Sequence, residues 1–434
     1  MSAPSASLHP KRSRALALAC GSAACLLVLA LLHRWRSLDY WNYSEGVYAL
    51  ISRLLLNGGD LYGDVVVAQP PVMFLAGAAM LAVNDSIEWL RLAVGTLQLV
   101  TAGLVALAVW RLTGLALAAA VAAPLALLTP WAVHEHGLLT PELVAAPLLV
   151  GGALLAARPR GAPAAAVALS LAVFVKAPFA APALLVAIAA IERRRCLAWL
   201  AAATLVQLAL WTALFGPSMW GDVVVAQQAT GLRTVKQLAE YASQGLWNLL
   251  GLLVPAGAAV ALLRDRALDR PLGRTCAALA AGLLLTLLTM VKNGTGVNVV
   301  VPVEAALVTL AVPGVAWALA DGRSRALRAA IAAGLVLLVA QTASLFAEPR
   351  DPRPFVRPDV SSGFGAGLET SEVRDELARA RRCEAGVAYS GLPYVAFVAG
   401  RRMPGGQPDG FLTAKSSKLT GVLAQIQADQ PRCP

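Results

Sequence analysis

The chain has 434 residues, of which 58% are hydrophobic and 14% are charged, and its mean hydropathy is +0.66. Soluble domains are about 25% charged, so this composition excludes a water-soluble fold that could bury its apolar surface. The formal net charge of +11 does not indicate nucleic-acid binding, because the basic residues stand in short clusters between apolar runs. Those runs are long and rich in Ala, Leu and Val, which predicts an all-α polytopic membrane protein rather than a β-barrel.

The first apolar run covers residues 15–32 and follows a basic tail, 1–14. Because it ends in basic residues rather than at a small-residue cleavage site, we predict an uncleaved first span. A polar loop, 34–89, comes next, and its apolar stretch 70–83 is short enough to predict a helix in the membrane interface. Ten more spans, eleven in all, are expected near 90–110, 115–131, 142–157, 163–175, 178–191, 197–215, 247–263, 275–291, 298–320 and 327–346.

The basic residues predict the orientation of the chain. With the N-terminus in the cytoplasm, the cytoplasmic segments hold sixteen Lys and Arg residues, and the opposite side holds eight before the C-terminal tail. This bias predicts a cytoplasmic N-terminus, an extracytoplasmic tail and a plasma-membrane location in a bacterium. The polar segments 34–89, 132–141, 216–246, 292–297 and 347–434 would then share the outer face, and any site would lie there.

The tail, 347–434, begins with a linker-like stretch that is rich in Pro, Gly and Asp, 347–366. Helical composition at 367–382 and 416–428 flanks a strand-like run at 385–399, so we expect a small extracytoplasmic α/β domain. Cys383 and Cys433 are the two cysteines of the tail and lie on the oxidising side in this topology. We therefore predict a disulfide between them.

The loop 34–89 carries most of the candidate chemistry. It contains Asp39, the run from Ser44 to Tyr48, the segment Gly58 to Asp64, and Gln69-Pro70-Pro71. Carboxylates and aromatics beside a membrane suit general-base catalysis and stacking on a sugar ring. The alternative is an interfacial aromatic belt with solvated acids.

The order of these motifs resembles the GT-C membrane glycosyltransferases, above all the bacterial aminoarabinose transferases and protein O-mannosyltransferases. The likeness covers most of residues 15–346 and includes Thr140-Pro141-Glu142, Lys176-Ala177-Pro178 and the segment Lys292 to Asn298. It implies an inverting transfer of a sugar from a polyprenyl-phosphate donor to a glycan, lipid or protein acceptor. Three positions depart from the family pattern: Ser44 replaces an Asp, Gln69 replaces a basic residue, and Val299 replaces a Tyr.

The resemblance implies roles for individual residues. Glu45 is the acid left at the motif and becomes the candidate base, with Asp39 as a second catalytic candidate. Basic groups would balance the departing lipid phosphate. The candidate substrate-binding residues are Tyr48, Arg53, Tyr62, Asp64, Gln69, Glu142, Lys176, Lys292 and Asn298.

Several of these residues also have plain structural interpretations. Glu142 could cap its helix, and Lys176 and Lys292 could extend to the membrane surface. His134-Glu135-His136 has no standard zinc spacing and more simply caps a span end, although it is the one weak candidate for a divalent cation. Two other functions remain open: a transporter or lipid flippase, although no internal repeat is evident, and an inactive scaffold in envelope-glycan assembly.

Overall fold

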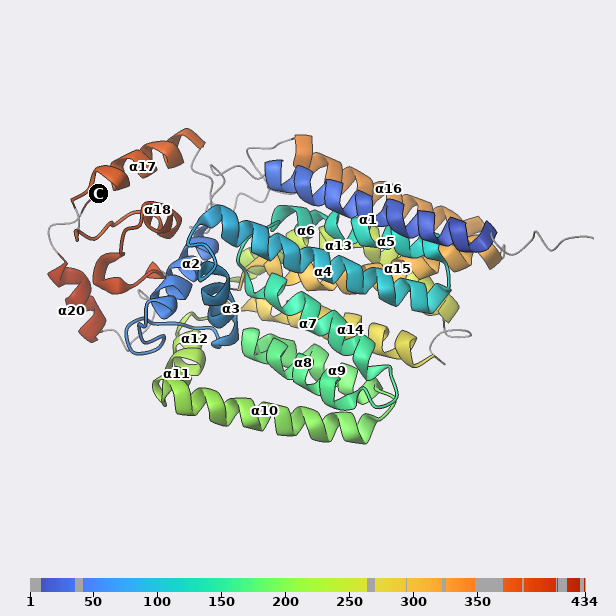
Figure 1. Cartoon of the computed structure of the whole chain (residues 1–434), viewed down its shortest axis with the longest axis horizontal. Helices are drawn as coiled ribbons and strands as arrows, with labels where there is room; N and C mark the ends of the chain where they lie inside the picture. The colour runs from blue at the N-terminus through green and yellow to red at the C-terminus, as the bar shows by residue number, and fades with distance from the viewer. Residues whose placement is uncertain are drawn as a thin grey trace, which may run out of the picture.

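The structure of the chain is a computed structural model that describes residues 9–35, 42–263, 270–293, 295–321, 325–347, 370–384, 386–410, 412, 420–429 and 433. Figure 1 shows the helices side by side in a bundle, with the C-terminal segments seated at one end. We call the described residues 370–433 the cap, and the end of the bundle that carries them the cap end.

Six described segments are long and apolar enough to cross a membrane: 13–34, 87–113, 193–215, 271–291, 300–320 and 325–344. They belong to α1 (His9–Trp35), α4 (Ile87–Thr113), α10 (Arg193–Phe215), α14 (Pro271–Thr286) with η3 (Leu287–Val291), α15 (Val300–Asp321) and α16 (Arg325–Ala347). The other five predicted spans coincide with shorter apolar helices, namely α5 (Ala116–Leu127), α7 (Pro141–Ala156), α8 (Ala162–Val175), α9 (Ala180–Ala189) and the apolar part, 245–258, of α13 (Val235–Leu263). The chain is therefore a multi-pass helical membrane protein.

The bundle has a central helix and a lipid-facing rim. Within the apolar segment of α15, 72% of the residues are buried, whereas in α10 only 6% are. Helix α15 packs on α13, α4, α14, α5 and α7. Small residues let the helices approach closely: a Cβ atom on Gly282 of α14 would lie 2.3 Å from the Cα atom of Pro182 in α9.

At the cap end, shorter elements cover the bundle. Helix α2 (Tyr43–Leu56) begins at Asn42, whose side chain accepts a hydrogen bond from the Glu45 amide at 3.1 Å. Helix α3 (Val72–Leu81) has ten residues, which reach about 15 Å, and it packs on α2. After α10, three short helical turns lie near the same end: α11 (Ser218–Trp220), the π-helical turn η2 (Gly221–Ala226) and α12 (Gln227–Ala229).

The cap consists of α17 (Thr370–Arg382), α18 (Pro393–Val398), the turn η5 (Pro404–Gly406) and α20 (Thr420–Ala428). The prediction of an α/β tail is wrong: across its described residues the cap has no strand, and the run 385–399 holds helix α18. Pro393 supplies a preset φ at the start of that helix. The apolar run is buried against α2 and α17, so its strand-like composition reflects burial rather than pairing.

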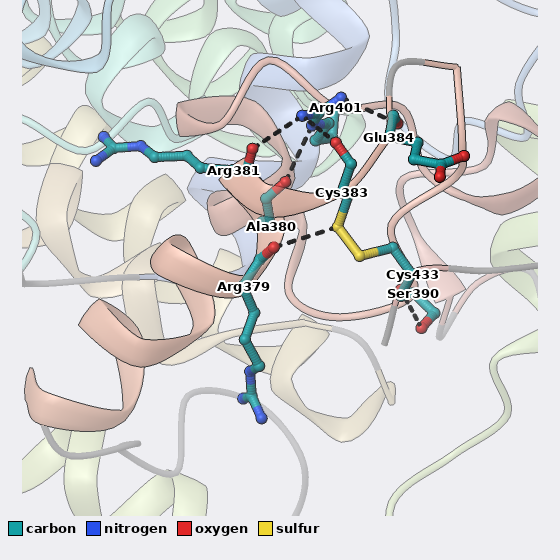
Figure 2. Close-up of a disulfide and its surroundings, with 8 residues drawn as sticks. All are labelled: Arg379, Ala380, Arg381, Cys383, Glu384, Ser390, Arg401 and Cys433. Carbon is teal, nitrogen blue, oxygen red and sulfur yellow. Dashed lines mark hydrogen bonds between the residues drawn. A yellow bond between two sulfur atoms is a disulfide. The ribbon is translucent and has the colours of Figure 1, made fainter.

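A disulfide joins the two ends of the cap. Cys383 follows α17, Cys433 lies near the chain terminus, and their Cα atoms are 5.9 Å apart (Figure 2). Arg401 lies beside the bridge and donates hydrogen bonds to the carbonyls of Ala380 and Cys383 at 3.0 and 2.7 Å. Closing a loop of 50 residues removes chain entropy equivalent to about 4 kcal/mol. Covalent closure therefore substitutes for the large hydrophobic core that this small unit lacks.

Candidate functional site

A pocket opens at the cap end between three parts of the chain. Helix α2 contributes one wall, the loop 66–69 and Phe74 a second, and the segment after α10 together with the cap closes it. Its lining residues are Tyr43, Ser44, Val47, Tyr48, Ile51, Val66, Val67, Ala68, Gln69, Phe74, Gln227, Thr230, Asp409 and Leu412. The free volume is about 60 Å³, or about two water molecules. A sugar would therefore enter only after the cap or the loop has shifted.

The loop wall is held in an extended form by side chains from distant segments. The buried Gln407 of the cap accepts from the Val66 amide at 3.0 Å and donates to the Asp64 carbonyl at 2.8 Å. Asp222, also buried, accepts from the Val67 amide at 3.2 Å. These contacts satisfy backbone groups that would otherwise be costly to bury, so the loop, α11–η2 and the cap form one structural unit.

Tyr48 and Gln69 lie on the pocket wall, as the motif predicted for substrate-binding residues. Burial raises the pKa of the Tyr48 phenol, and the carboxylates of Glu142 and Asp409 raise it further. Tyr48 therefore stays a neutral hydrogen-bond donor at physiological pH. Both Glu142 and Asp409 therefore lie close enough to Tyr48 to act on its phenol.

Glu142 in the first turn of α7, Lys176 just after α8 and Asn298 in the 3-10 turn η4 (Val297–Val299) come together. The Lys176 ammonium forms an ion pair with Glu142, and the Asn298 side-chain amide donates to the other carboxylate oxygen at 2.9 Å. Glu142 is fully buried, whereas the Lys176 side chain is 10% exposed. Three predicted substrate-binding residues therefore form one polar cluster, in which Lys176 does not extend to the surface.

Lys292 lies in the turn after η3 and points to the pocket wall. Its ammonium donates to the side-chain oxygen of Gln227, which in turn donates to the Ala68 carbonyl at 2.9 Å. Burial lowers the pKa of Lys292 to about 8. The turn is fixed by Arg233, whose guanidinium donates to the Lys292 and Thr295 carbonyls at 2.8 and 2.6 Å. Lys292 is thus a preorganised cation next to the pocket.

Glu45 does not line the pocket. Its carboxylate forms a bidentate ion pair with Arg91 of α4, at 2.9 and 2.7 Å, and the two side chains are 0% and 3% exposed. The Arg91 guanidinium carbon also lies 5.3 Å from the ring centre of Tyr394 in α18. The pair therefore connects α2, the bundle and the cap, which is a structural arrangement rather than that of an available base.

Arg53 has a similar position at the other end of α2. It pairs with Asp85 at 2.8 Å, donates to the Phe397 carbonyl at 2.8 Å, and its guanidinium carbon lies 3.6 Å from the Phe397 ring centre. The predicted phosphate contact of Arg53 is thus replaced by contacts that hold α18 on α2. Together with Arg91, it makes the cap a fixed part of the molecule.

The remaining candidates of the first loop lie apart from the pocket. The Tyr62 hydroxyl donates to the Gln69 carbonyl at 2.9 Å and its ring packs on Phe215, so it supports the loop from behind. Asp64 accepts from the Asp60 amide at 2.7 Å and is exposed. Asp39 lies outside the described residues.

The metal hypothesis for His134-Glu135-His136 gains no support. The His134 ring nitrogen Nδ1 lies 2.8 Å from the Glu135 carboxylate. Within the described part of the chain, no three His, Cys, Asp or Glu side chains are grouped so that they could hold a metal ion. The simpler reading as a polar span end fits these contacts.

Sequence reasoning missed four residues. Arg91 contributed to the sequence analysis only as one of the eight basic residues on the outer side. A basic residue at the fifth position of an apolar helix is, however, a functional or structural signal in its own right. Glu304 in α15 is a second such signal: it is fully buried and accepts from the Trp131 and Ala132 amides, both at 3.0 Å. Asp222 and Asp409 had no local signal, because only the fold brings them to the loop 66–69 and to the pocket.

Comparison with known proteins supports the fold. No protein-family model matches the chain, and no curated protein matches it. Solved structures of ArnT from Cupriavidus metallidurans do match, one bound to undecaprenyl phosphate and one in the apo state. Both have a TM-score of 0.56, with 18% and 19% sequence identity, and both cover 95% of this chain and 77% of the ArnT chain. The predicted likeness to the aminoarabinose transferases is thus confirmed at the level of the fold.

Proposed function

We propose that this protein is a membrane glycosyltransferase that moves a sugar from a polyprenyl-phosphate donor to an acceptor at the cap end. The observation that carries the proposal is the position of Lys292, a partly buried cation that contacts the pocket-lining Gln227. The fold adds support, because an ArnT structure with this fold is bound to undecaprenyl phosphate. A polyprenyl chain would lie in the membrane and bring its phosphate to the end of the bundle.

Lys292 and Lys176 are suited to different stages of the reaction, namely donor binding and the departure of the phosphate. Lys292 is held only by a neutral amide oxygen, so a phosphate could take over that contact without breaking an ion pair. Lys176 is already paired with Glu142, but an ammonium can rotate between two anions because it is a point charge with three donors. We assign Lys292 to donor binding and Lys176 to the charge that develops as the phosphate leaves.

The groups that line the pocket suit a sugar acceptor or donor. Tyr48, Gln69, Gln227 and Thr230 present hydroxyl and amide groups to it, and Phe74 supplies an apolar face. Hydrogen-bonding groups around an aromatic surface are suited to a polyol ring. The topology proposal accompanies this one: the cap end is extracytoplasmic and the protein resides in a bacterial plasma membrane, as the basic-residue bias indicates.

The test is binding and transfer by the purified full-length protein in proteoliposomes. Undecaprenyl phosphate is titrated first, and transfer is then followed with a panel of radiolabelled undecaprenyl-phosphate hexoses, pentoses and amino sugars, using membranes of the source cells as acceptor. Lys292→Gln should weaken lipid-phosphate binding about tenfold or more. Lys236→Gln is the matched control, because Lys236 is exposed in the first turn of α13.

Binding without transfer of any sugar would favour the scaffold hypothesis. Movement of the lipid phosphate across the bilayer without sugar transfer would favour a flippase. If the protein binds no undecaprenyl phosphate, or if Lys292→Gln binds it as tightly as the parent does, the proposed function is wrong.

A further inference from the structure

We propose that Asp409, contributed by the cap, is the carboxylate that accepts the acceptor's proton during transfer. This inference rests on the proposed function and assigns its catalytic base. Asp409 is the one carboxylate among the described residues that line the pocket. It reaches the site from a part of the chain more than 300 residues away from the other wall, α2, so the cap would be a catalytic component and not only a cover.

The geometry of Asp409 is that of a positioned group. Its Oδ1 atom accepts from the Leu412 amide at 3.0 Å and from the Tyr43 hydroxyl at 3.3 Å. The first contact fixes the carboxylate to its own turn, and the second fixes it to α2. Both donors stabilise the ionised form, which is the form that can accept a proton. The side chain is partly exposed, so the pocket can hydrate it or an acceptor hydroxyl can reach it.

The other acids near the pocket are not among the residues that line it. Glu45 is closed in its bidentate pair with Arg91. Glu142 is engaged by Lys176 and Asn298, and Asp222 accepts from the Val67 amide behind the loop. Ser44 lies on the pocket wall but carries no carboxylate. The opposite charges also come from different segments: Asp409 belongs to the cap, whereas Lys292 follows η3 of the bundle and contacts Gln227.

This separation matches the needs of the reaction. An acceptor O–H gives its proton to Asp409 as its oxygen forms a bond to the anomeric carbon of the sugar. The bond between that carbon and the phosphate oxygen breaks, and the phosphate leaves with the electron pair as polyprenyl phosphate. With the donor and the acceptor as the two substrates, atoms and charge balance, and no change of oxidation state occurs. Attack and departure occur on opposite faces of the sugar, so the products have inverted configuration.

The test compares Asp409→Asn and Asp409→Ala with Asp375→Asn in the proteoliposome assay. Asp375 is exposed on α17 of the same cap and controls for the loss of a cap carboxylate. Asn retains an oxygen for the Leu412 amide, so the turn should persist. We expect Asp409→Asn to lower transfer by about 10²–10⁴-fold while undecaprenyl phosphate binding stays within about twofold of the parent. Added formate should restore part of the transfer by Asp409→Ala, because a small carboxylate can occupy the vacated space.

Each outcome decides one of the two proposals. If the parent transfers sugar and Asp409→Asn does so at the parental rate, the assignment of Asp409 is wrong and the glycosyltransferase proposal stands. If Asp409→Asn loses both transfer and lipid-phosphate binding, and formate restores nothing in Asp409→Ala, Asp409 holds the cap in place and is not the base. If the parent itself neither binds undecaprenyl phosphate nor transfers sugar, the proposed function fails first.

Discussion

Glu45 and Glu142 are both fully buried near the cap end, and each faces a basic side chain, but the two pairs are built differently. Glu45 meets the planar guanidinium of Arg91 through two parallel hydrogen bonds, and the Tyr394 ring lies over the guanidinium. Glu142 meets one ammonium, shares its second oxygen with Asn298, and its lysine partner is 10% exposed. The Glu45–Arg91 pair is buried, whereas the lysine of the Glu142–Lys176 pair is partly accessible.

The difference teaches that burial alone does not identify a catalytic acid. A bidentate arginine pair fixes orientation and resists exchange, so it suits the attachment of α2 to the bundle and cap. An ammonium on a flexible chain can exchange partners, so it suits a site where a phosphate arrives and leaves. The motif around Glu45 adjoins the pocket through Ser44 and Tyr48, whereas the Glu45 carboxylate is paired with Arg91.

The substitution Glu45→Gln should therefore act mainly on stability. It leaves the Arg91 charge buried without a counter-ion, and breaking such a pair costs about 3–5 kcal/mol. We expect reduced expression, a lower unfolding temperature in detergent and faster proteolysis at the junction of cap and bundle. A Glu45→Gln protein with parental stability and a selective loss of turnover would instead restore Glu45 as the base.

The substitution Lys176→Gln should show the opposite pattern. Glu142 keeps its hydrogen bond from Asn298, and Gln can replace one donor of the lysine, so the loss of stability should be smaller than for Glu45→Gln. Transfer should fall about 30- to 100-fold through kcat, equivalent to about 2–3 kcal/mol of lost charge stabilisation. A change in stability as large as that of Glu45→Gln, with no separate effect on kcat, would make both pairs structural. Lys176→Arg tests whether charge alone is sufficient.

The sequence predicted the fold better than the roles of single residues. Apolar runs follow directly from the bilayer, so the eleven predicted spans coincide with helices in the structure, and the stretch after Pro70-Pro71, which is predicted to lie in the interface, forms the ten-residue helix α3. The run 385–399 was misassigned because a buried six-residue helix and a buried strand have the same apolar composition. The order of the motifs carried the resemblance to the aminoarabinose transferases, which the fold comparison confirmed.

The site was predicted only where its residues are local or carry a charge in an apolar setting. Tyr48 and Gln69 do line the pocket, and Glu142, Lys176 and Asn298 do meet. Arg53 could not be interpreted correctly, because its partner Phe397 is 344 residues away. The position of Asp409 at the pocket could not be predicted from the sequence for the same reason. Long-range contacts decide whether a charged side chain holds two elements together or faces a ligand, and spacing along the chain does not contain that information.

Gly46 tests whether the cap must sit on α2 for function. A Cβ atom at this position would lie 2.1 Å from the amide nitrogen of Tyr394, so Gly46→Ala must push α18 away from α2. Overpacking of this kind costs about 1–3 kcal/mol, and displacement of the cap should lower transfer. Gly103→Ala in α4 is the matched control, because a Cβ there meets nothing within 4 Å. Limited proteolysis and transfer are measured together, and parental values of both for Gly46→Ala would contradict a fixed cap.

The smallest expected effect is on the pH dependence of kcat/KM for the donor, which distinguishes the role of Lys292 from that of Lys176. Burial lowers the pKa of Lys292 to about 8, so its ammonium is charged below that pH and becomes neutral above it. Because the charged form binds phosphate, kcat/KM for the donor should be level below pH 8 and fall up to tenfold for each further pH unit, or about 1.4 kcal/mol. In Lys292→Arg the guanidinium stays charged, so this decline should disappear even if the overall rate is lower. The profile is recorded with the parent, Lys292→Arg and the exposed-site control Lys236→Gln. An identical decline in all three would mean that another group titrates, and that Lys292 does not hold the phosphate.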